Sequence, residues 1–470
     1  MTLNSRLRPL IESEITTGAL ANRFEILKGI LSDTTPELPL LISSPAEEIN
    51  PLDWLSGIRT SPRVYWKSRE SDIEIAGIGS ANTVTSPDND PEDPKGIRHI
   101  EEVLANAGQE FAYFLGGRFF DFDAVTDELW SGFPKTWYTL PEKMLIRRGN
   151  RFFEVAAASV QRDMEFDDFV QTLQASIDIR QSAKSPKQQD ADFEEISRTD
   201  FPDKAGWISN VNNVLNDIRS GEIEKTVMAR RTDFQFRDQV DPVHLLDLLS
   251  RENKNCYAFM FEPCAGKAFI GVTPERHFKL SCSRVQTEAL SGTTARGSDT
   301  DDDIRKGQKL LSSDKNSREH GFVLKDVLSR LKLVCDDVSE PSEKTLLRLS
   351  NVSHIYSAIE GSLKAGSSIQ NVLESLHPTP AVGGTPTEKA LELIRQLEPF
   401  SRGWYAAPVG VVGSSMTDMA VAIRSALVSG RKVSLFAGAG IVDGSDPESE
   451  WAELEHKIST ATKLFSGVAV

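Results

Sequence analysis

The sequence has few of the features that mark thiolate metal sites, redox pairs or membrane spans. Its 470 residues include four cysteines, Cys256, Cys264, Cys282 and Cys335. No two of them form a CxxC pair, which excludes zinc knuckles and CxxC redox motifs and favours buried, reduced thiols. No apolar run is long enough to cross a bilayer, and the N-terminal MTLNSRLRPLIESEI contains no apolar signal-peptide core. We therefore expect a cytoplasmic protein that has no membrane partner.

Positive charge is also scarce. The chain has 53 Lys and Arg against 69 Asp and Glu, which gives a formal net charge of -16 and a pI of about 5.1. No basic patch interleaved with aromatic residues occurs, which argues against nucleic acid or an anionic membrane as a partner. If such an acidic protein binds an anion, a metal ion or a few placed Arg and Lys residues must supply local positive charge.

Two polar stretches divide the chain. TSPDNDPEDPKG (85–96) is rich in Pro and Asp and predicts a surface loop, and QSAKSPKQQDADFEEISRTD (181–200) predicts a connection. We divide the chain at the second stretch into an N-terminal region, 1–195, and a C-terminal region, 200–470. The length suits two or three average domains or one large one.

Strands and helices follow one another without a regular βαβ alternation. Apolar periodicity predicts strands at 64–69, 73–80, 111–120, 143–157 (around a turn at Gly149-Asn150), 225–234, 257–263, 267–274, 277–282, 284–290, 406–413, 419–429 and 432–437. It predicts helices at 205–220, 317–335, 367–376 and 386–397. This order favours an α+β protein in which antiparallel sheets are packed with outer helices.

The C-terminal segment GSDPESEWAELEHK (444–457) predicts a helix with charged residues along a buried face. Trp451 and Leu454 belong to an apolar stripe, and Glu450, Glu453 and Lys457 recur beside it at helical spacing. Carboxylate oxygens are ligands that Mg²⁺ prefers. A single glutamate on a helix most often faces solvent, so a metal site requires that other segments converge here.

Glu319 stands beside an apolar stripe of the predicted helix at 317–335, and it is a candidate third carboxylate for Mg²⁺. Its neighbour His320, and His456 near Glu453, make zinc an alternative. There is no HExxH motif, however, and adjacent residues on a helix point away from each other.

Three charged residues interrupt β-prone segments. Glu288, in TEALSGTTARG (287–297), is a candidate general acid if it is buried, whereas a solvated turn is the simpler alternative. Lys225, at the start of an apolar strand, is either an edge residue with its ammonium in water or a desolvated base. Arg424, in AVAIRSALV, needs an anionic partner if it points inward.

Two glycine-rich segments leave alternatives open. FAGAGIVDG (436–444) does not match GxGxxG, because Asp443 stands where the third glycine should fall, so a Rossmann nucleotide site is disfavoured. Its glycines let backbone N–H groups approach an anion, or only ease a turn. HPTPAVGGTP (377–386) is a rigid loop that walls a pocket or connects two elements.

Taken together, these segments resemble the chorismate-utilising enzymes, and most closely the isochorismate synthases of the menaquinone type. The matching segments are IEKTVMAR, GVTPERHF, TEALSGTTARG, DKNSREH, HPTPAVGGTP, RGWYAAPVGVV, AVAIRSA and FAGAGIVDGSDPESEWAELEHK. Weaker matches at PLDWL, YWKSR, FLGGRFFD, WSGFP and LPE extend the resemblance over nearly the whole chain, except 85–96 and 181–200.

The resemblance implies the anthranilate synthase component I-like fold, in which antiparallel sheets form a sandwich with flanking helices. It implies that Glu319 and Glu453 bind Mg²⁺, that Glu450 acts nearby through water, and that Lys457 lies near the ring carboxylate of chorismate. Arg424 and Tyr405 match residues that bind the enolpyruvyl carboxylate. Further substrate contacts are implied for Gly292, Thr293, His354 and Gly440.

The implied reaction converts chorismate to isochorismate, with Lys225 as the base that activates water and Glu288 as the acid for the leaving C4 hydroxyl. The ammonia-using relatives typically lack this lysine, so no glutamine amidotransferase partner is expected. A salicylate synthase, which goes on to eliminate pyruvate, is the alternative activity. A catalytically silent binding protein is a further alternative, and the residues leave open a menaquinone, siderophore or salicylate pathway.

Overall fold

The computed structural model describes residues 17–32, 35–86, 95–178, 193–339, 344–349 and 352–466, without the side chains of Lys95, Asp178, Lys315 and Glu319. Most of the predicted loop at 85–96 and most of the predicted connection at 181–200 therefore lie outside the described residues.

Strands of the described residues form two antiparallel sheets. The larger one has twelve strands. In pairing order they are β1 (Glu37–Pro45), β8 (Arg151–Gln161), β7 (Lys143–Arg148), β3 (Ile73–Ile78), β2 (Arg63–Lys67), β11 (Tyr257–Cys264), β12 (Lys267–Thr273), β21 (Ser425–Ser429), β22 (Lys432–Ile441), β10 (Lys225–Phe236) and β18 (Gly384–Thr385), and β9 (Glu195–Phe201) also pairs with β10.

The smaller sheet has ten strands among the described residues. They are β15 (Cys335–Asp336), β17 (Val352–Leu363), β14 (Arg284–Ala295), β13 (Arg276–Ser281), β20 (Met416–Val421), β19 (Pro408–Gly413), β5 (Tyr113–Arg118), β6 (Thr136–Leu140) and β4 (Asn82–Thr85), with β16 (Thr345–Arg348) paired to β17. Since β2 pairs with β11 and β5 pairs with β19, strands from both halves of the sequence share both sheets.

The sheets pack face to face, and strand alternation explains why. Along β11, Phe259 and Phe261 belong to the core between the sheets, whereas Ala258 and Met260 belong to a second core beneath helices. The helices over that second core are α3 (Pro51–Leu55), α6 (Lys204–Ser220), α7 (Pro242–Glu252) and α12 (Pro447–Phe465). The predicted α+β sandwich with flanking helices is confirmed.

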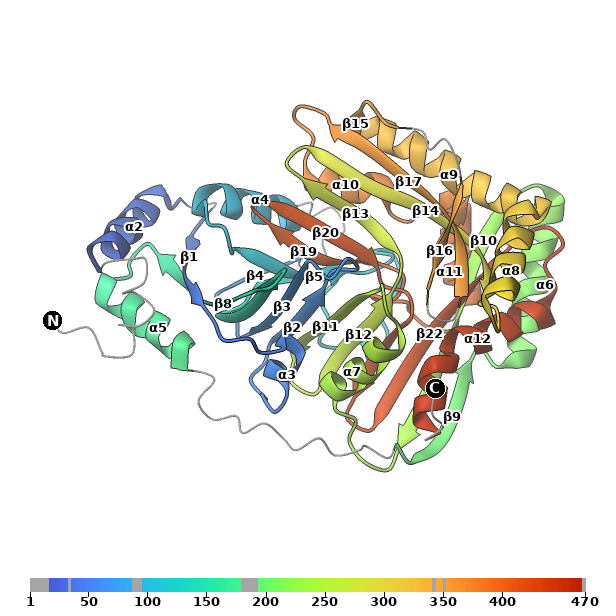
Figure 1. Ribbon diagram of the computed structural model, residues 1–470, viewed down its shortest axis with the longest axis horizontal. Helices are drawn as coiled ribbons and strands as arrows, with labels where there is room; N and C mark the ends of the chain where they lie inside the picture. Colours follow the sequence, from blue (N-terminus) through green and yellow to red (C-terminus); the bar gives the residue numbers. More distant parts are fainter. Residues whose placement is uncertain are drawn as a thin grey trace.

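Other helices cover the smaller sheet and the ends of the sandwich. On the smaller sheet lie α4 (Lys95–Ala107), α9 (Asp314–Val334) and α10 (Ile369–Leu376). Figure 1 shows α2 (Thr17–Ile30) and α5 (Phe166–Asp178) at one end of the molecule, and α6, α8 (Thr300–Ser312), α11 (Thr387–Leu397) and α12 gathered at the other. The short 3-10 helix η1 (Glu128–Trp130) brings Trp130 into the core.

None of the helices in the described ranges is long and apolar enough to cross a bilayer.

Two predictions about strands are wrong. The single strand expected at 419–429 is two strands, β20 and β21, which belong to different sheets. The chain leaves the first and enters the second at Arg424, whose φ of +49° is left-handed and incompatible with a continuous strand. Residues 195–200, assigned to the polar connection, begin β9, an edge strand whose exposed polar side chains hide the usual apolar alternation.

Candidate active site

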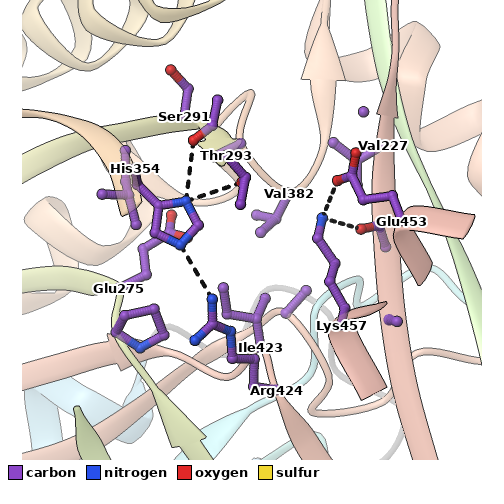
Figure 2. Close-up of a pocket in the computed structure, with 18 of the residues that line it drawn as sticks. Val227, Glu275, Ser291, Thr293, His354, Val382, Ile423, Arg424, Glu453 and Lys457 are labelled. Carbon is purple, nitrogen blue, oxygen red and sulfur yellow. Dashed lines mark hydrogen bonds and ion pairs between the residues drawn. The ribbon is translucent and has the colours of Figure 1, made fainter. Parts of the chain in front are cut away.

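A cavity of about 220 Å³ opens where the ends of both sheets meet α12. Its walls come from β10 and β22 of the larger sheet, β14 and β17 of the smaller sheet, the turn before β13, α12 and residues 402–406. Figure 2 shows His354 and Arg424 on one side of this space and Glu453 and Lys457 on the other. Segments far apart in the sequence therefore converge, as the metal-site and substrate-site predictions require.

Most of the predicted site residues line this cavity: Lys225, Gly292, Thr293, His354, Tyr405, Arg424, Gly440, Glu450, Glu453 and Lys457. Glu288 is not among its lining residues. The side chain of Glu319 lies outside the described residues, although its helix α9 contributes Asn316 to the wall.

The charged edge of α12 faces the cavity because the start of the helix is fixed. Asp446 is the N-cap and accepts a hydrogen bond from the Ser449 N–H at 2.9 Å, with Pro447 at the first helical position. The Lys457 ammonium lies 2.6 Å from the Glu453 carboxylate and donates to the Gly438 carbonyl at 2.8 Å (Figure 2). A cationic group thus already sits at the Glu453 oxygens.

The predicted metal site contains carboxylate oxygen atoms. Glu450 is buried and Glu453 is partly buried, and both line the cavity. Within the described side chains, no group of three or more His, Cys, Asp or Glu forms a cation site, and Glu319 is outside that set. Carboxylates beside a bound ammonium fit Mg²⁺ better than zinc, which favours His and Cys ligands.

Arg424 is held by a histidine instead of the carboxylate that we expected. Its Nη2 donates to His354 Nε2 at 3.2 Å. On the other side of the ring, Nδ1 lies 3.1 Å from both the Gly292 carbonyl oxygen and Thr293 Oγ1. A carbonyl only accepts hydrogen bonds, so Nδ1 carries the proton and Nε2 is free to accept from Arg424. His354 must be neutral to orient the guanidinium in this way.

The electrostatics of His354 agree with this tautomer. Burial is the largest cause that lowers the pKa of His354, and the positive charges of Arg424 and Lys457 act in the same direction against the raising effect of its hydrogen bond to Gly292, which together give a pKa of about 3. The ring therefore stays neutral throughout the physiological range, and no carboxylate of the described residues forms a hydrogen bond or ion pair with the Arg424 guanidinium.

Lys225 begins β10 as a buried residue, only 3% exposed, and not as an edge lysine in water. β18 pairs beside it, with Lys225 opposite Thr385. A Cβ on Gly384 would lie 2.3 Å from the Lys225 carbonyl oxygen, so this approach requires glycine. The HPTPAVGGTP segment therefore forms a wall of the site through Val382 and is more than a connection.

Arg402 is a residue that sequence reasoning missed, although RGWYAAPVGVV contains it. Its guanidinium donates to the Val227 carbonyl at 2.6 Å, the Val382 carbonyl at 2.8 Å and the Glu398 carboxylate at 2.5 and 2.9 Å. It ties β10, the 377–386 loop and the end of α11 to the segment that carries Tyr405. Tyr405 stacks on Phe436 with ring centroids 5.2 Å apart.

Glu288 is fully buried behind the cavity wall. Its two carboxylate oxygens accept hydrogen bonds from Arg69 Nη1 and Nη2, both at 2.8 Å, and Oε1 also accepts from the Arg276 N–H at 2.8 Å. The alternative of a solvated turn is therefore wrong. Arg69 was not recognised on the sequence, because it lies 219 residues before its partner.

Comparison with known proteins adds independent information. The family model described as chorismate binding enzyme matches residues 27–465. Isochorismate synthase 2, chloroplastic, from Arabidopsis thaliana is 34% identical over 404 residues, which cover 84% of this chain and 71% of that protein.

Two solved structures are also similar. The menaquinone-specific isochorismate synthase MenF from Escherichia coli superimposes with a TM-score of 0.79 at 29% identity, covering 95% of this chain and 99% of that one. Anthranilate synthase component I from Streptococcus pneumoniae has a TM-score of 0.69 at 19% identity, covering 90% and 100%, and shares the fold. The expected anthranilate synthase component I-like fold is thereby confirmed.

We predict that acid destabilises the fold partly through His354. Its pKa of about 3 in the folded state lies below the ordinary value of 6.5, so the unfolded chain binds a proton first and stability falls as pH drops below about 6.5. Between pH 7.5 and 5, this group should lower the free energy of unfolding by about 2 kcal/mol. Urea unfolding at both pH values measures this change. From pH 7.5 to pH 5, the free energy of unfolding should fall by about 2 kcal/mol less in His354→Gln than in wild type. The exposed His456→Gln is the control, and equal losses in His354→Gln and wild type would contradict a neutral His354.

Proposed function

Because the chain belongs to the chorismate-binding enzyme family and is an isochorismate synthase within it, we propose that this cavity converts chorismate to isochorismate. The observation that carries the proposal is the buried Lys225, which lines the same cavity as Arg424, Lys457 and the carboxylates of α12. A base, anion-binding groups and metal-binding oxygens are what addition of water to a dicarboxylate needs.

The substrate is a dianion, and this cavity supplies positive charge that the acidic chain otherwise lacks. Arg424, oriented by His354, binds the enolpyruvyl carboxylate, with Tyr405 beside it. Lys457 lies near the ring carboxylate. Backbone groups around Gly292, Thr293 and Gly440 provide further donors at the cavity wall.

Metal dependence is general among isochorismate synthases, and we assign Mg²⁺ to this chain. Glu453 and Glu319 would hold it, and Glu450 would act through water. The ion would supply counter-charge for the ring carboxylate in a wall that otherwise repels an anion. Lys457, which pairs with Glu453 here, would then be released toward the substrate.

The reaction forms a C–O bond at C2 from water and breaks the C–O bond at C4, while the ring double bonds shift. Lys225, which is buried at the cavity wall, removes a proton from the attacking water. We assign Glu288, which Arg69 holds behind the cavity wall, as the acid for the leaving C4 hydroxyl. Each of these proton transfers is worth roughly 10²–10⁴-fold in rate, and the two effects need not be independent.

We further propose a cytoplasmic enzyme of menaquinone synthesis. Water is the nucleophile, so the chain needs no glutamine amidotransferase partner to supply ammonia.

Product analysis tests the function directly. Purified protein incubated with chorismate and Mg²⁺ should form isochorismate without pyruvate, and an excess of EDTA should stop product formation. Chromatography separates these products. Salicylate with pyruvate would instead identify a salicylate synthase, and unchanged chorismate would contradict enzymatic activity.

Glu453→Gln should abolish Mg²⁺-dependent turnover without unfolding the protein, because an amide keeps the shape but loses the charge of the ligand. Mutation of a residue that hydrogen-bonds to a metal ligand typically lowers metal affinity or activity 10–100-fold. We therefore expect loss of a direct ligand to lower the rate at least about 100-fold. Steady-state rates across a Mg²⁺ titration measure it. Glu448→Gln, exposed in the first turn of the same helix, is the matched control. Wild-type Mg²⁺ dependence in Glu453→Gln would refute the metal assignment.

Lys225→Ala should lose about 10²–10⁴-fold in kcat yet still bind chorismate, because the base acts on water and not on the substrate carboxylates. Isothermal calorimetry gives the affinity and product analysis the rate. Lys204→Ala, a half-exposed lysine on α6, should match wild type in both. A variant that binds weakly but turns over bound substrate at the normal rate would make Lys225 a binding residue and not the base.

A further inference from the structure

Arg69 is a buried arginine that the N-terminal region contributes behind the cavity. It follows β2 of the larger sheet, and it binds Glu288 on β14 of the smaller sheet. Arg69 Nη1 and Nη2 each donate to one carboxylate oxygen at 2.8 Å, and the two side chains are 10% and 0% exposed. Two parallel hydrogen bonds of this kind require a planar guanidinium, because the ammonium of a lysine acts as a point charge. The pair therefore bridges the two sheets behind the cavity wall.

The surroundings of Arg69 hold its guanidinium in place. Nη1 also donates to the Pro274 carbonyl at 2.7 Å, Nε lies 3.6 Å from the Glu70 carboxylate, and the guanidinium carbon lies 5.7 Å from the ring centre of the fully buried Tyr257. Burial by itself lowers the pKa of Arg69, but the charge and hydrogen bonds of Glu288 outweigh it, and the pKa lies above its ordinary value. Since Pro274 lines the cavity, Arg69 connects Glu288 directly to a residue of the wall.

The contacts of Glu288 leave one position on its carboxyl group for a proton. A carboxylate has about four lone-pair positions, shared equally between its oxygens. Oε1 accepts from Arg69 Nη1 and from the Arg276 backbone N–H, both at 2.8 Å, whereas Oε2 accepts only from Arg69 Nη2 among the described residues. A proton on Oε2 therefore leaves all of these hydrogen bonds intact. Glu288 also shares a face of β14 with Leu290, which lines the cavity.

We propose that Arg69 is a positioning residue for the acid Glu288, which fixes the direction of the carboxyl group and stabilises the negative charge that forms there as the proton leaves. This inference rests on the proposed function. The proton passes from Oε2 of Glu288 to the C4 oxygen as the C4–O bond breaks, the electron pair of that bond leaves with the oxygen, and water is released. At C2, the oxygen of a second water forms the new bond and Lys225 takes its proton, which returns to Glu288 through solvent. The carboxylate that remains after the transfer is the form that Arg69 binds most strongly.

Substitution of Arg69 tests the rate separately from binding. Arg69→Met should lower kcat by about 10²-fold, because a small misplacement of a catalytic group has a cost of that order, while calorimetry shows retained chorismate affinity. Arg69→Lys should recover part of the rate, since it keeps the charge but not the two parallel hydrogen bonds. Arg284→Met is the matched control and should behave as wild type, because Arg284 lies on the same strand as Glu288 but is 69% exposed and pairs with Glu360.

A double-mutant cycle distinguishes positioning of Glu288 from a general structural role. In a Glu288→Gln background, Arg69→Met should change kcat by less than about twofold, because a residue that acts through Glu288 has no acid left to position. The double variant also removes both charges and leaves no unpaired buried ion. If Arg69→Met alone does not fold, Arg69→Lys in both backgrounds gives the same comparison. An equal loss in both backgrounds, or wild-type kcat in the single variant, would overturn the proposal. Isochorismate formation by the wild-type protein decides separately whether the proposed function holds.

Discussion

The buried guanidinium of Arg402 connects several walls of the cavity that we propose as the active site. It links β10, the loop that contains Val382 and the end of α11 through the Val227 and Val382 carbonyls and the Glu398 carboxylate. Loss of one partner of a buried charge pair typically costs 3–5 kcal/mol, because the other charge is left uncompensated. Lys225 and Tyr405 stand two residues before Val227 and three after Arg402, so this one group fixes two walls of the site relative to each other.

Charge is distributed very differently inside the cavity and over the whole chain. The net charge of -16 would repel a dianionic substrate, but the cavity gathers Lys225, Arg424 and Lys457 around its interior. His354 keeps this positive charge available, because it is neutral and orients Arg424 without neutralising it. Substrate attraction thus depends on a buried, uncharged ring.

The sequence allowed prediction of what is local and amphipathic. The α+β class with antiparallel sheets, most strands near Lys225 and Glu288, and the Glu450–Glu453–Lys457 edge of α12 follow from periodicity and capping. The sandwich arrangement came from the resemblance. The rest depends on contacts between distant segments. The Glu288–Arg69 pair and the role of Arg402 cannot be deduced from spacing, and β9 lacks apolar alternation because it is an exposed edge. Resemblance to a family supplied the role of Tyr405, for which residue chemistry alone gave no reason.

Two of the chain crossings between the sheets occur at the cavity, and they help to explain why the cavity lies there. The chain passes from β12 to β13 through Glu275, and from β20 back to β21 through Arg424. The crossings run side by side, since the Val421 N–H donates to the Glu275 carbonyl at 3.0 Å and the Val272 N–H donates to the Arg424 carbonyl at 3.2 Å. At such crossings the regular ladder of backbone hydrogen bonds between strands ends. A side chain there can point into the space between the sheets without breaking strand pairing. Addition of water needs polar groups on opposite sides of one ring, and two sheets that meet at their ends supply β10 and β22 from one sheet and β14 and β17 from the other.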